Sequence, residues 1–184
     1  LANSPLQVNV ELLRLDTHRS SSNSEQHLDT FYRYFSEVKN NNYDALLITG
    51  APLAHLEYEE VAYWEELKVI IDWAEQHVTS TLFSCWAAHA ALYHRYNLKR
   101  DLKDNKLCGV FTHQCYFAHG ALTRGFDDTF LVPHSRYGHI DINKINACEE
   151  LVVLAGSARV GAYLLKNKSG SQVFITGHPE YDAD

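Results

Sequence analysis

The chain has 184 residues, of which 46% are hydrophobic and 21% charged, a balance typical of one globular domain with a substantial core. Its formal net charge of −7 argues against a general nucleic-acid-binding protein, which would carry a basic face. No apolar run reaches the ~20 residues of a membrane helix and no signal-peptide pattern opens the chain, so we expect a cytoplasmic protein.

The two ends of the sequence indicate an incomplete domain. The chain starts at Leu1 without an initiator methionine, contains no Met, and stops at Asp184 just after a His-Pro-Glu motif. We therefore expect one domain over residues 1–184, truncated at both ends. Its cysteines form no C-x-x-C pair, which favours free thiols in a reducing compartment. They are Cys85, Cys108, Cys115 and Cys148.

The N-terminal part alternates predicted strands and helices. Val8–Leu15 is predicted to be a strand, and Ser20–Ser24 a loop. A helix is predicted next, because large apolar residues recur at helical spacing. These residues are Leu28, Phe31, Tyr32, Phe35 and Val38. Ala45–Thr49 is a short continuous apolar run, typical of a buried parallel strand, and ends in a turn at residues 50–52.

The central part repeats this pattern around a cysteine. Tyr63–His77 is predicted to be a helix and Thr79–Ser84 a buried strand. Cys85 follows at once, and Ala87–Tyr96 has the alanine and leucine content of a helix. Lys99–Asn105 is charged and polar, and is predicted to be a loop.

The C-terminal part is dominated by short strand-like runs. These are Leu107–Phe111, Phe130–Val132, Leu151–Ala155, Ala162–Leu165 and Val173–Thr176. No repeat, low-complexity tract or linker divides the chain. The alternation predicts a three-layer α/β fold with a mostly parallel sheet and helices on both faces.

Cys85 lies where a predicted strand turns into a helix. At such a junction the side chain projects from the sheet end, and the N-terminal dipole of the helix favours thiolate, the attacking form of the thiol. The amide of Trp86 is then placed to hold a tetrahedral oxyanion. The competing interpretation is an unreactive core cysteine, since free cysteines are often buried.

His178 and Glu180 follow the last predicted strand. Because parallel strands bring their carboxyl ends to one edge of a sheet, His178 is well placed to meet Cys85. Glu180 could orient the imidazole and stabilise its charged form. The alternative is a surface His and Glu in a loop. The two motifs together favour a Cys/His/Glu triad.

Long motifs spread over nearly the whole chain resemble the homoserine O-succinyltransferase/O-acetyltransferase family, which shares the class I glutamine amidotransferase-like, flavodoxin-like fold. The motifs occupy residues 3–8, 49–53 (TGAPL), 61–64, 79–87 (TSTLFSCWA), 122–128, 133–137 (PHSRY) and 176–182 (TGHPEYD). The family also has a strand before this segment and an arginine for the substrate carboxylate after it. Both lie beyond this sequence, in agreement with truncation.

The resemblance implies a role for each of these residues. Cys85 would be the nucleophile that carries an acyl-thioester, His178 the general base, and Glu180 the third member of the triad. Leu53 and Trp86 match the positions whose backbone amides form the oxyanion hole. A single triad would then serve both half-reactions of a ping-pong mechanism.

The resemblance also implies a substrate site. Lys106, Ser135 and Arg136 match motif positions that contact substrate. Ala54 occupies the position that selects the acyl donor, where glutamate goes with acetyl transfer and glycine with succinyl transfer. Alanine matches neither, so the donor is acetyl-CoA or succinyl-CoA.

The acceptor implied by the family is homoserine, in methionine biosynthesis. Serine, in cysteine biosynthesis, is the alternative, because one methylene gives only ~1–3 kcal/mol of discrimination. The resemblance implies no metal and no tightly bound cofactor, and it is consistent with a homodimer. No nucleic acid or membrane partner is expected.

Two other functions compete with acyl transfer. Related glutaminases typically flank the cysteine with glycines, whereas Phe83 and Ala87 stand here. The bulkier residues at this strand-to-helix turn argue against glutamine hydrolysis. A non-catalytic binding member of the family is the other alternative, and it predicts an unreactive Cys85.

Three further sets of residues have weaker functional interpretations. His89 lies four residues after Cys85, but a packed helix histidine is the simpler interpretation. His113, Cys115 and His119, with His134 and His139 nearby, match no established zinc spacing. The basic run Lys99, Arg100, Lys103 and Lys106 either receives the phosphates of coenzyme A or is a solvated loop.

Overall fold

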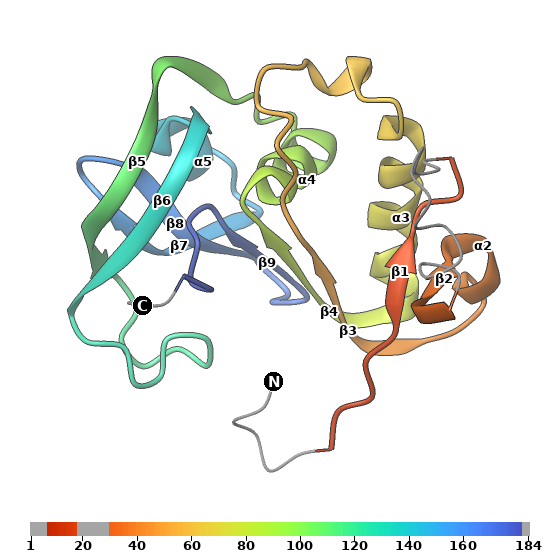
Figure 1. The fold of residues 1–184 in the computed structure, drawn as a ribbon. Coiled ribbons are helices and arrows are strands. Elements are labelled where there is room, and N and C mark those ends of the chain that lie inside the picture. Colours follow the sequence, from red (N-terminus) through yellow and green to blue (C-terminus); the bar gives the residue numbers. More distant parts are fainter. Residues whose placement is uncertain (1–6, 18–29, 182–184) are drawn as a thin grey trace.

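The computed structural model describes residues 7–17 and 30–181, and its centre is a seven-stranded mixed sheet (Figure 1). The strand order is β3-β4-β9-β8-β7-β5-β6. The strands are β3 (Tyr43–Ile48), β4 (Val78–Ser84), β5 (Asp101–Cys115), β6 (Thr129–His139), β7 (Leu151–Ser157), β8 (Gly161–Asn167) and β9 (Gln172–Ile175).

The sheet is not mostly parallel, which corrects the prediction. Only β3–β4 and β4–β9 are parallel pairs among the described strands of this sheet, and the other neighbours are antiparallel. Parallel neighbours need a long crossover connection, usually a helix. A helix connects β3 to β4, but loops and turns without a crossover helix join β5 to β6, β7 to β8 and β8 to β9.

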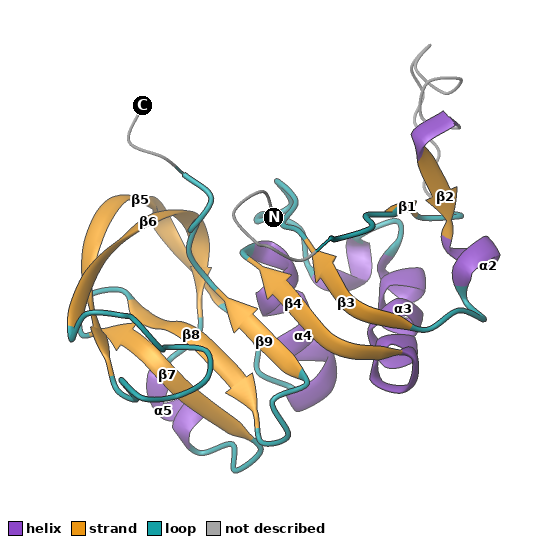
Figure 2. Cartoon of the chain, turned by 90° about the horizontal axis from the view of Figure 1, so that it is seen from below, coloured by secondary structure: helices purple, strands orange, loops and turns teal. Residues whose placement is uncertain are grey.

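The helices of the described residues lie on one face of the sheet (Figure 2). Three of them are α3 (Trp64–His77), α4 (Trp86–Tyr96) and α5 (Ile142–Asn146), and their apolar residues share one core cluster with Phe83 and Phe174. On the opposite face the β5–β6 pair arches over β7 and β8, and Val132 packs with Tyr163. The predicted helical layers on both faces are therefore wrong for this part of the chain.

Among residues 7–17 and 30–181, little covers the face of β3 that lies opposite α3. Leu47 is 58% exposed there, although it lies in the middle of a strand. The prediction of a parallel strand at Ala45–Thr49 is confirmed, but its burial on both faces is not. No described helix is long and apolar enough to cross a membrane.

The predicted elements around Cys85 are confirmed. The helix expected over Tyr63–His77 is α3, the strand over Thr79–Ser84 is β4, and the helix over Ala87–Tyr96 is α4. The alanines of α4 are fully buried, so this helix lies close to the sheet. They are Ala87, Ala88, Ala90 and Ala91.

The helix predicted to reach Val38 is interrupted, which corrects that prediction. Tyr32–Tyr34 forms β2 and pairs in parallel with β1 (Leu12–Arg14), a shorter strand than the predicted Val8–Leu15. Helix α2 (Phe35–Val38) follows, with Phe35 and Val38 packed against α3. Residues 20–24 and Leu28 lie outside the described residues.

The predicted loop at Lys99–Asn105 is also wrong from Asp101 onward. Strand β5 already begins at Asp101, because β6 is long enough to pair with it as far as His139. The register shifts between Leu102 and Leu107, where the polar stretch interrupts the pairing. A short 3-10 helix, η1 (Tyr58–Glu60), precedes α3.

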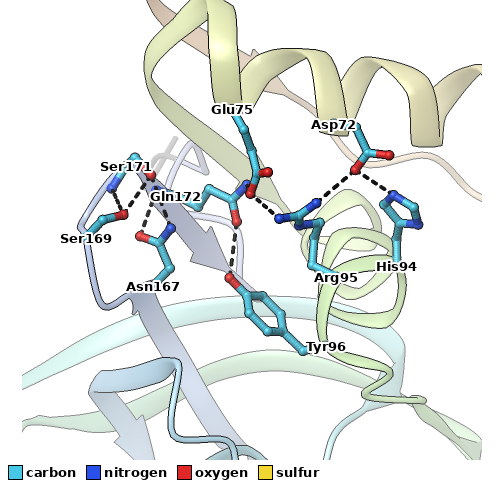
Figure 3. Close-up of polar contacts among 9 residues, drawn as sticks. All are labelled: Asp72, Glu75, His94, Arg95, Tyr96, Asn167, Ser169, Ser171 and Gln172. Atoms are coloured by element: carbon cyan, nitrogen blue, oxygen red, sulfur yellow. Dashed lines mark hydrogen bonds and ion pairs between the residues drawn. The ribbon is translucent and has the colours of Figure 1, made fainter.

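A polar network ties α3, α4 and β9 together at the end of β9 remote from Cys85 (Figure 3). Arg95 of α4 pairs with Asp72 at 3.0 Å and with Glu75, both on α3. Glu75 accepts a hydrogen bond from Gln172 of β9, whose own carbonyl accepts one from Tyr96 at 3.2 Å. These contacts brace α4 and β9, at whose opposite ends the predicted catalytic residues lie.

Candidate active site

Cys85 occupies a strained elbow between β4 and α4. Its backbone has φ 52° and ψ −116°, a region that residues with a side chain rarely adopt. Its amide donates to the carbonyl of Ile175 in β9 at 2.8 Å, and its carbonyl accepts the amide of His89 at 3.3 Å. Such strain persists only where neighbouring contacts fix the chain, and it is common at functional sites.

Gly50, which follows β3, makes room for this elbow. A Cβ atom at Gly50 would lie 3.0 Å from the Cβ of Cys85 and 3.3 Å from the nitrogen of Trp86. The turn at residues 50–52 therefore needs a glycine at its start. Its absent side chain lets the ends of β3 and β4 approach one another.

His178 follows β9, the other parallel neighbour of β4. Its amide donates to the carbonyl of Pro133 at 2.9 Å, which ties the segment to β6. Its Nδ1 lies 2.6 Å from Oε1 of Glu180, and its ring stacks on Tyr181 at 4.6 Å. The bond to Glu180 leaves Nε2 as the nitrogen available for proton transfer.

One open cavity of about 580 Å³ collects nearly all of the predicted site residues. Its lining includes Cys85, Trp86, His178, Glu180, Lys106, Ser135, Arg136 and Ala54. Cys85 as a whole is half-buried and lines this open cavity. The predicted triad needs a cavity shared with His178 and a cysteine that is not sealed in the core, and the arrangement is compatible with both requirements.

Opposing effects act on the thiol. Burial raises the pKa of Cys85, and Glu180 adds to the rise. The amide of Trp86 and the positive charges of Arg136 and Lys106 lower the same pKa. Because burial is the largest of these effects, the resting thiol needs a base to remove its proton.

The two predicted oxyanion donors differ in geometry. The Trp86 amide, at the start of α4, lowers the pKa of the Cys85 thiol and so acts directly on the reacting group. The Leu53 amide instead donates to the carbonyl of Ala51 at 2.8 Å. Leu53 could serve an oxyanion only if that hydrogen bond opened.

The basic run at residues 99–106 is divided by the structure. Arg100 turns toward the loop after β3, donating to the carbonyl of Leu56 at 2.6 Å, with its guanidinium 4.6 Å from the ring centre of Tyr58. Arg100 and Lys106 nevertheless line the same cavity as Cys85, whereas Lys103 lines a different hollow. The four basic residues therefore do not form one cluster, and a phosphate-binding role for Arg100 and Lys106 stays a prediction.

The structure also places the histidines for which the sequence offered weaker functional interpretations. His89 is buried in α4, and its burial, with the nearby Arg136 charge, holds its pKa well below the usual range. His113 points into the core and contacts His134. In residues 7–17 and 30–181, no three His, Cys, Asp or Glu side chains gather as a metal site.

Sequence reasoning missed the contact between His134 and Arg136. Val132, His134 and Arg136 alternate along β6 and are all buried. This alternation was available as a signal within the PHSRY motif. The partner strand that buries them could not be identified from local sequence.

Comparisons with known proteins identify the family. The homoserine O-succinyltransferase family profile matches residues 1–184. The chain belongs to this family. It is 89% identical over 184 residues to a homoserine O-succinyltransferase of Pseudoalteromonas translucida and 51% identical to one of Alteromonas mediterranea. All of the chain is matched, but it spans only 58% and 59% of those relatives.

Solved structures place this family member in the class I glutamine amidotransferase-like α/β fold. A glutamine amidotransferase from Thermotoga maritima has a TM-score of 0.58 at 14% identity, covering 94% of this chain and 76% of that one. The glutaminase domain of Trypanosoma brucei CTPS has a TM-score of 0.67 at 7% identity, covering 96% and 88%. At these identities the likeness shows the fold alone.

Proposed function

We propose that the protein transfers a succinyl group from succinyl-CoA to the hydroxyl of homoserine through a thioester on Cys85. The observation that carries this proposal is the strained Cys85 elbow in the same open cavity as the His178–Glu180 pair. Membership of the homoserine O-succinyltransferase family supports the choice of reaction.

In the first half-reaction, Nε2 of His178 accepts the proton of the Cys85 thiol. The thiolate attacks the thioester carbonyl of the donor, and the tetrahedral oxyanion is met by the Trp86 amide. When the intermediate collapses, the carbonyl carbon keeps its new bond to Cys85 and loses its bond to the coenzyme A sulfur. The departing thiolate takes the proton from His178.

In the second half-reaction, His178 removes the proton from the acceptor hydroxyl. The oxygen attacks the acyl-thioester, and the bond to Cys85 breaks as the ester forms. The proton on His178 then returns to the sulfur. One base thus serves both steps, and Glu180 stabilises the charged imidazole each time.

The cavity favours a donor that carries a negative charge. Lys106 and Arg136 both line it, and Ala54 presents no carboxylate at the donor-selecting position. A succinyl carboxylate therefore meets positive charge in this cavity and no carboxylate at position 54, whereas an acetyl group carries no charge for these cations to bind. The relatives' names also specify succinyl transfer.

Intact-protein mass spectrometry of the full-length protein tests the proposal. Incubation with succinyl-CoA should add one acyl group to Cys85, and a Cys85→Ala variant should gain none. An unmodified sulfur would overturn the mechanism and favour a non-catalytic binding protein. Acetyl-CoA in a parallel reaction tests the donor.

Steady-state assays then test the acceptor. We expect homoserine to be preferred over serine by a factor that reflects one methylene, ~10–200-fold. Equal use of serine would point to cysteine biosynthesis instead. Release of ammonia from glutamine would support the glutaminase alternative.

A further inference from the structure

Three buried polar side chains form a chain of hydrogen bonds beneath the cavity. His134 Nε2 lies 3.1 Å from Nε2 of His113, and its Nδ1 lies 3.2 Å from Nε of Arg136. The exposed fractions are 0% for His113, 2% for His134 and 6% for Arg136. The aromatic rings of Phe111 and Tyr163 pack against the two imidazoles and shield these hydrogen bonds from solvent.

The hydrogen bonds of this chain can run in one direction only. Arg136 Nε has a proton and no lone pair, so it donates and His134 Nδ1 accepts. A neutral His134 then carries its proton on Nε2 and donates to Nε2 of His113. The remaining His113 nitrogen, Nδ1, donates to the carbonyl of Phe111 at 2.9 Å. Each ring is thereby fixed in one tautomer.

Both imidazoles must be neutral for this arrangement, and the surroundings favour that state. Burial lowers the pKa of His134 to about 3, with a further contribution from the Arg136 charge. Burial also lowers the pKa of His113. The pKa of Arg136 falls only to about 10, so the guanidinium keeps its charge near neutral pH.

Arg136 is a buried cation held by neutral groups. Besides His134, it donates to the carbonyls of Gly138 and of Val160, the latter at 2.6 Å. Among residues 7–17 and 30–181, no Asp or Glu lies within ion-pair distance of it. Burying a charge is costly unless an opposite charge meets it, and Arg136 lines the cavity that holds Cys85. Its charge therefore remains available to an anion in that cavity.

We propose that His134, oriented by His113, is a positioning residue that fixes the Arg136 guanidinium as the counter-charge for the Cys85 thiolate. The proposal rests on the proposed function only in taking Cys85 as the nucleophile. Arg136 favours the thiolate while burial opposes it. Because the charge acts over a short range, its effect depends on where the guanidinium is held.

Other charged groups also face the sulfur, so the test must isolate Arg136. Lys106 of β5 acts in the same direction as Arg136, and Glu180 acts against it. His178 shares the cavity. A matched pair of substitutions at His134 leaves all of these groups in place.

Two amide variants separate the two hydrogen bonds of His134. In His134→Asn, the amide oxygen lies near the former Nδ1 and can still accept from Arg136. In His134→Gln, the amide reaches the former Nε2 and keeps the link to His113 but removes the acceptor for Arg136. Both variants replace the ring with the same chemical group.

The measurement is the pH dependence of Cys85 alkylation by iodoacetamide in the full-length protein without acyl-CoA, read on the Cys85 peptide by mass spectrometry. For His134→Gln and for Arg136→Met, we expect the midpoint to rise by about one pH unit and the rate near neutral pH to fall about tenfold. His134→Asn should stay within about threefold of the native rate. His119→Gln, at an exposed histidine, is the control for replacing a histidine by glutamine.

Equal profiles for His134→Gln and His134→Asn would overturn the proposal, as would a native profile for Arg136→Met. If His134→Gln fails to fold, His113→Leu replaces it; an unshifted midpoint in folded His113→Leu would also overturn it. If these three side chains only filled the core, the substitutions would lower the free energy of unfolding without moving the midpoint of Cys85 alkylation. Because no acyl donor is used, a native protein that alkylates at Cys85 but forms no acyl-enzyme would contradict the proposed function alone.

Discussion

Glu180 determines which nitrogen of His178 is free to act as the base in the proposed mechanism. With Oε1 2.6 Å from Nδ1, the proton sits on Nδ1 and the charged imidazole is stabilised. Glu180→Gln keeps an acceptor but loses the charge, so we expect the rate of Cys85 acylation to fall about 10²-fold. Single-turnover mass spectrometry measures this rate. Glu65→Gln, at an exposed residue paired only with Lys68 among described contacts, is the control, and an equal loss in both would contradict the role.

Gly50 provides a second prediction at the scale of one residue. Gly50→Ala places a methyl group 3.0 Å from the Cβ of Cys85, so the elbow must shift. We expect acylation to slow at least ~10-fold, with ~1–3 kcal/mol lost from the free energy of unfolding. Gly125→Ala meets no atom within 4 Å but has a φ of 87°, so it should reduce stability and leave acylation unchanged. Native acylation in Gly50→Ala would refute this role for the glycine.

At the scale of elements, the Arg95 network joins helices and a strand without touching the site (Figure 3). Its ion pairs are partly exposed, so each contributes little. We expect Arg95→Met to lower the free energy of unfolding by ~1 kcal/mol and to leave acylation within about twofold. Urea unfolding and single-turnover acylation check the two parts. A large acylation loss at native stability would show that the network also positions the site.

Local sequence predicts the elements that carry their own helical or strand pattern. Helix α3 is predictable because Leu67, Ile70, Ile71 and Ala74 recur on one face, and all are buried. The same kind of spacing predicts a helix through Tyr32–Tyr34, which is wrong. Pairing with β1, a contact between residues about twenty apart, overrides the local preference there.

At the scale of the whole molecule, the part of the candidate site that follows parallel strands is predictable without knowledge of the strand order or register. Cys85 and His178 each follow a parallel strand, and parallel strands end at one edge of the sheet. The antiparallel half is not predictable in this way. His134 contacts His113 although the β5–β6 register places His134 opposite Gly109 and His113 opposite Phe130. The contact therefore depends on how the paired strands bend in the folded sheet, and not on any local motif.

Three buried histidines make the whole fold sensitive to acid. Burial lowers the pKa values of His89, His113 and His134 in the folded state, whereas in the unfolded chain a histidine titrates near ~6.5. Below that pH the unfolded chain binds protons that the folded protein does not, so stability falls as the pH falls. For His134, with a folded pKa of about 3, the loss between about pH 7.5 and 5 is about 2 kcal/mol, and the other two act in the same direction.

Urea unfolding at about pH 5, 6 and 7.5 measures this dependence above the range where most carboxylates titrate. His134→Asn should remove the contribution of His134 to the pH dependence of the free energy of unfolding, because the neutral amide binds no proton in either state. This holds even if the substitution lowers stability near neutral pH. His119→Asn, at an exposed position, should leave the slope as it is. The same free energy of unfolding at both ends of this pH range would show that the buried imidazoles accept protons without cost, and would remove the physical basis for their fixed tautomers.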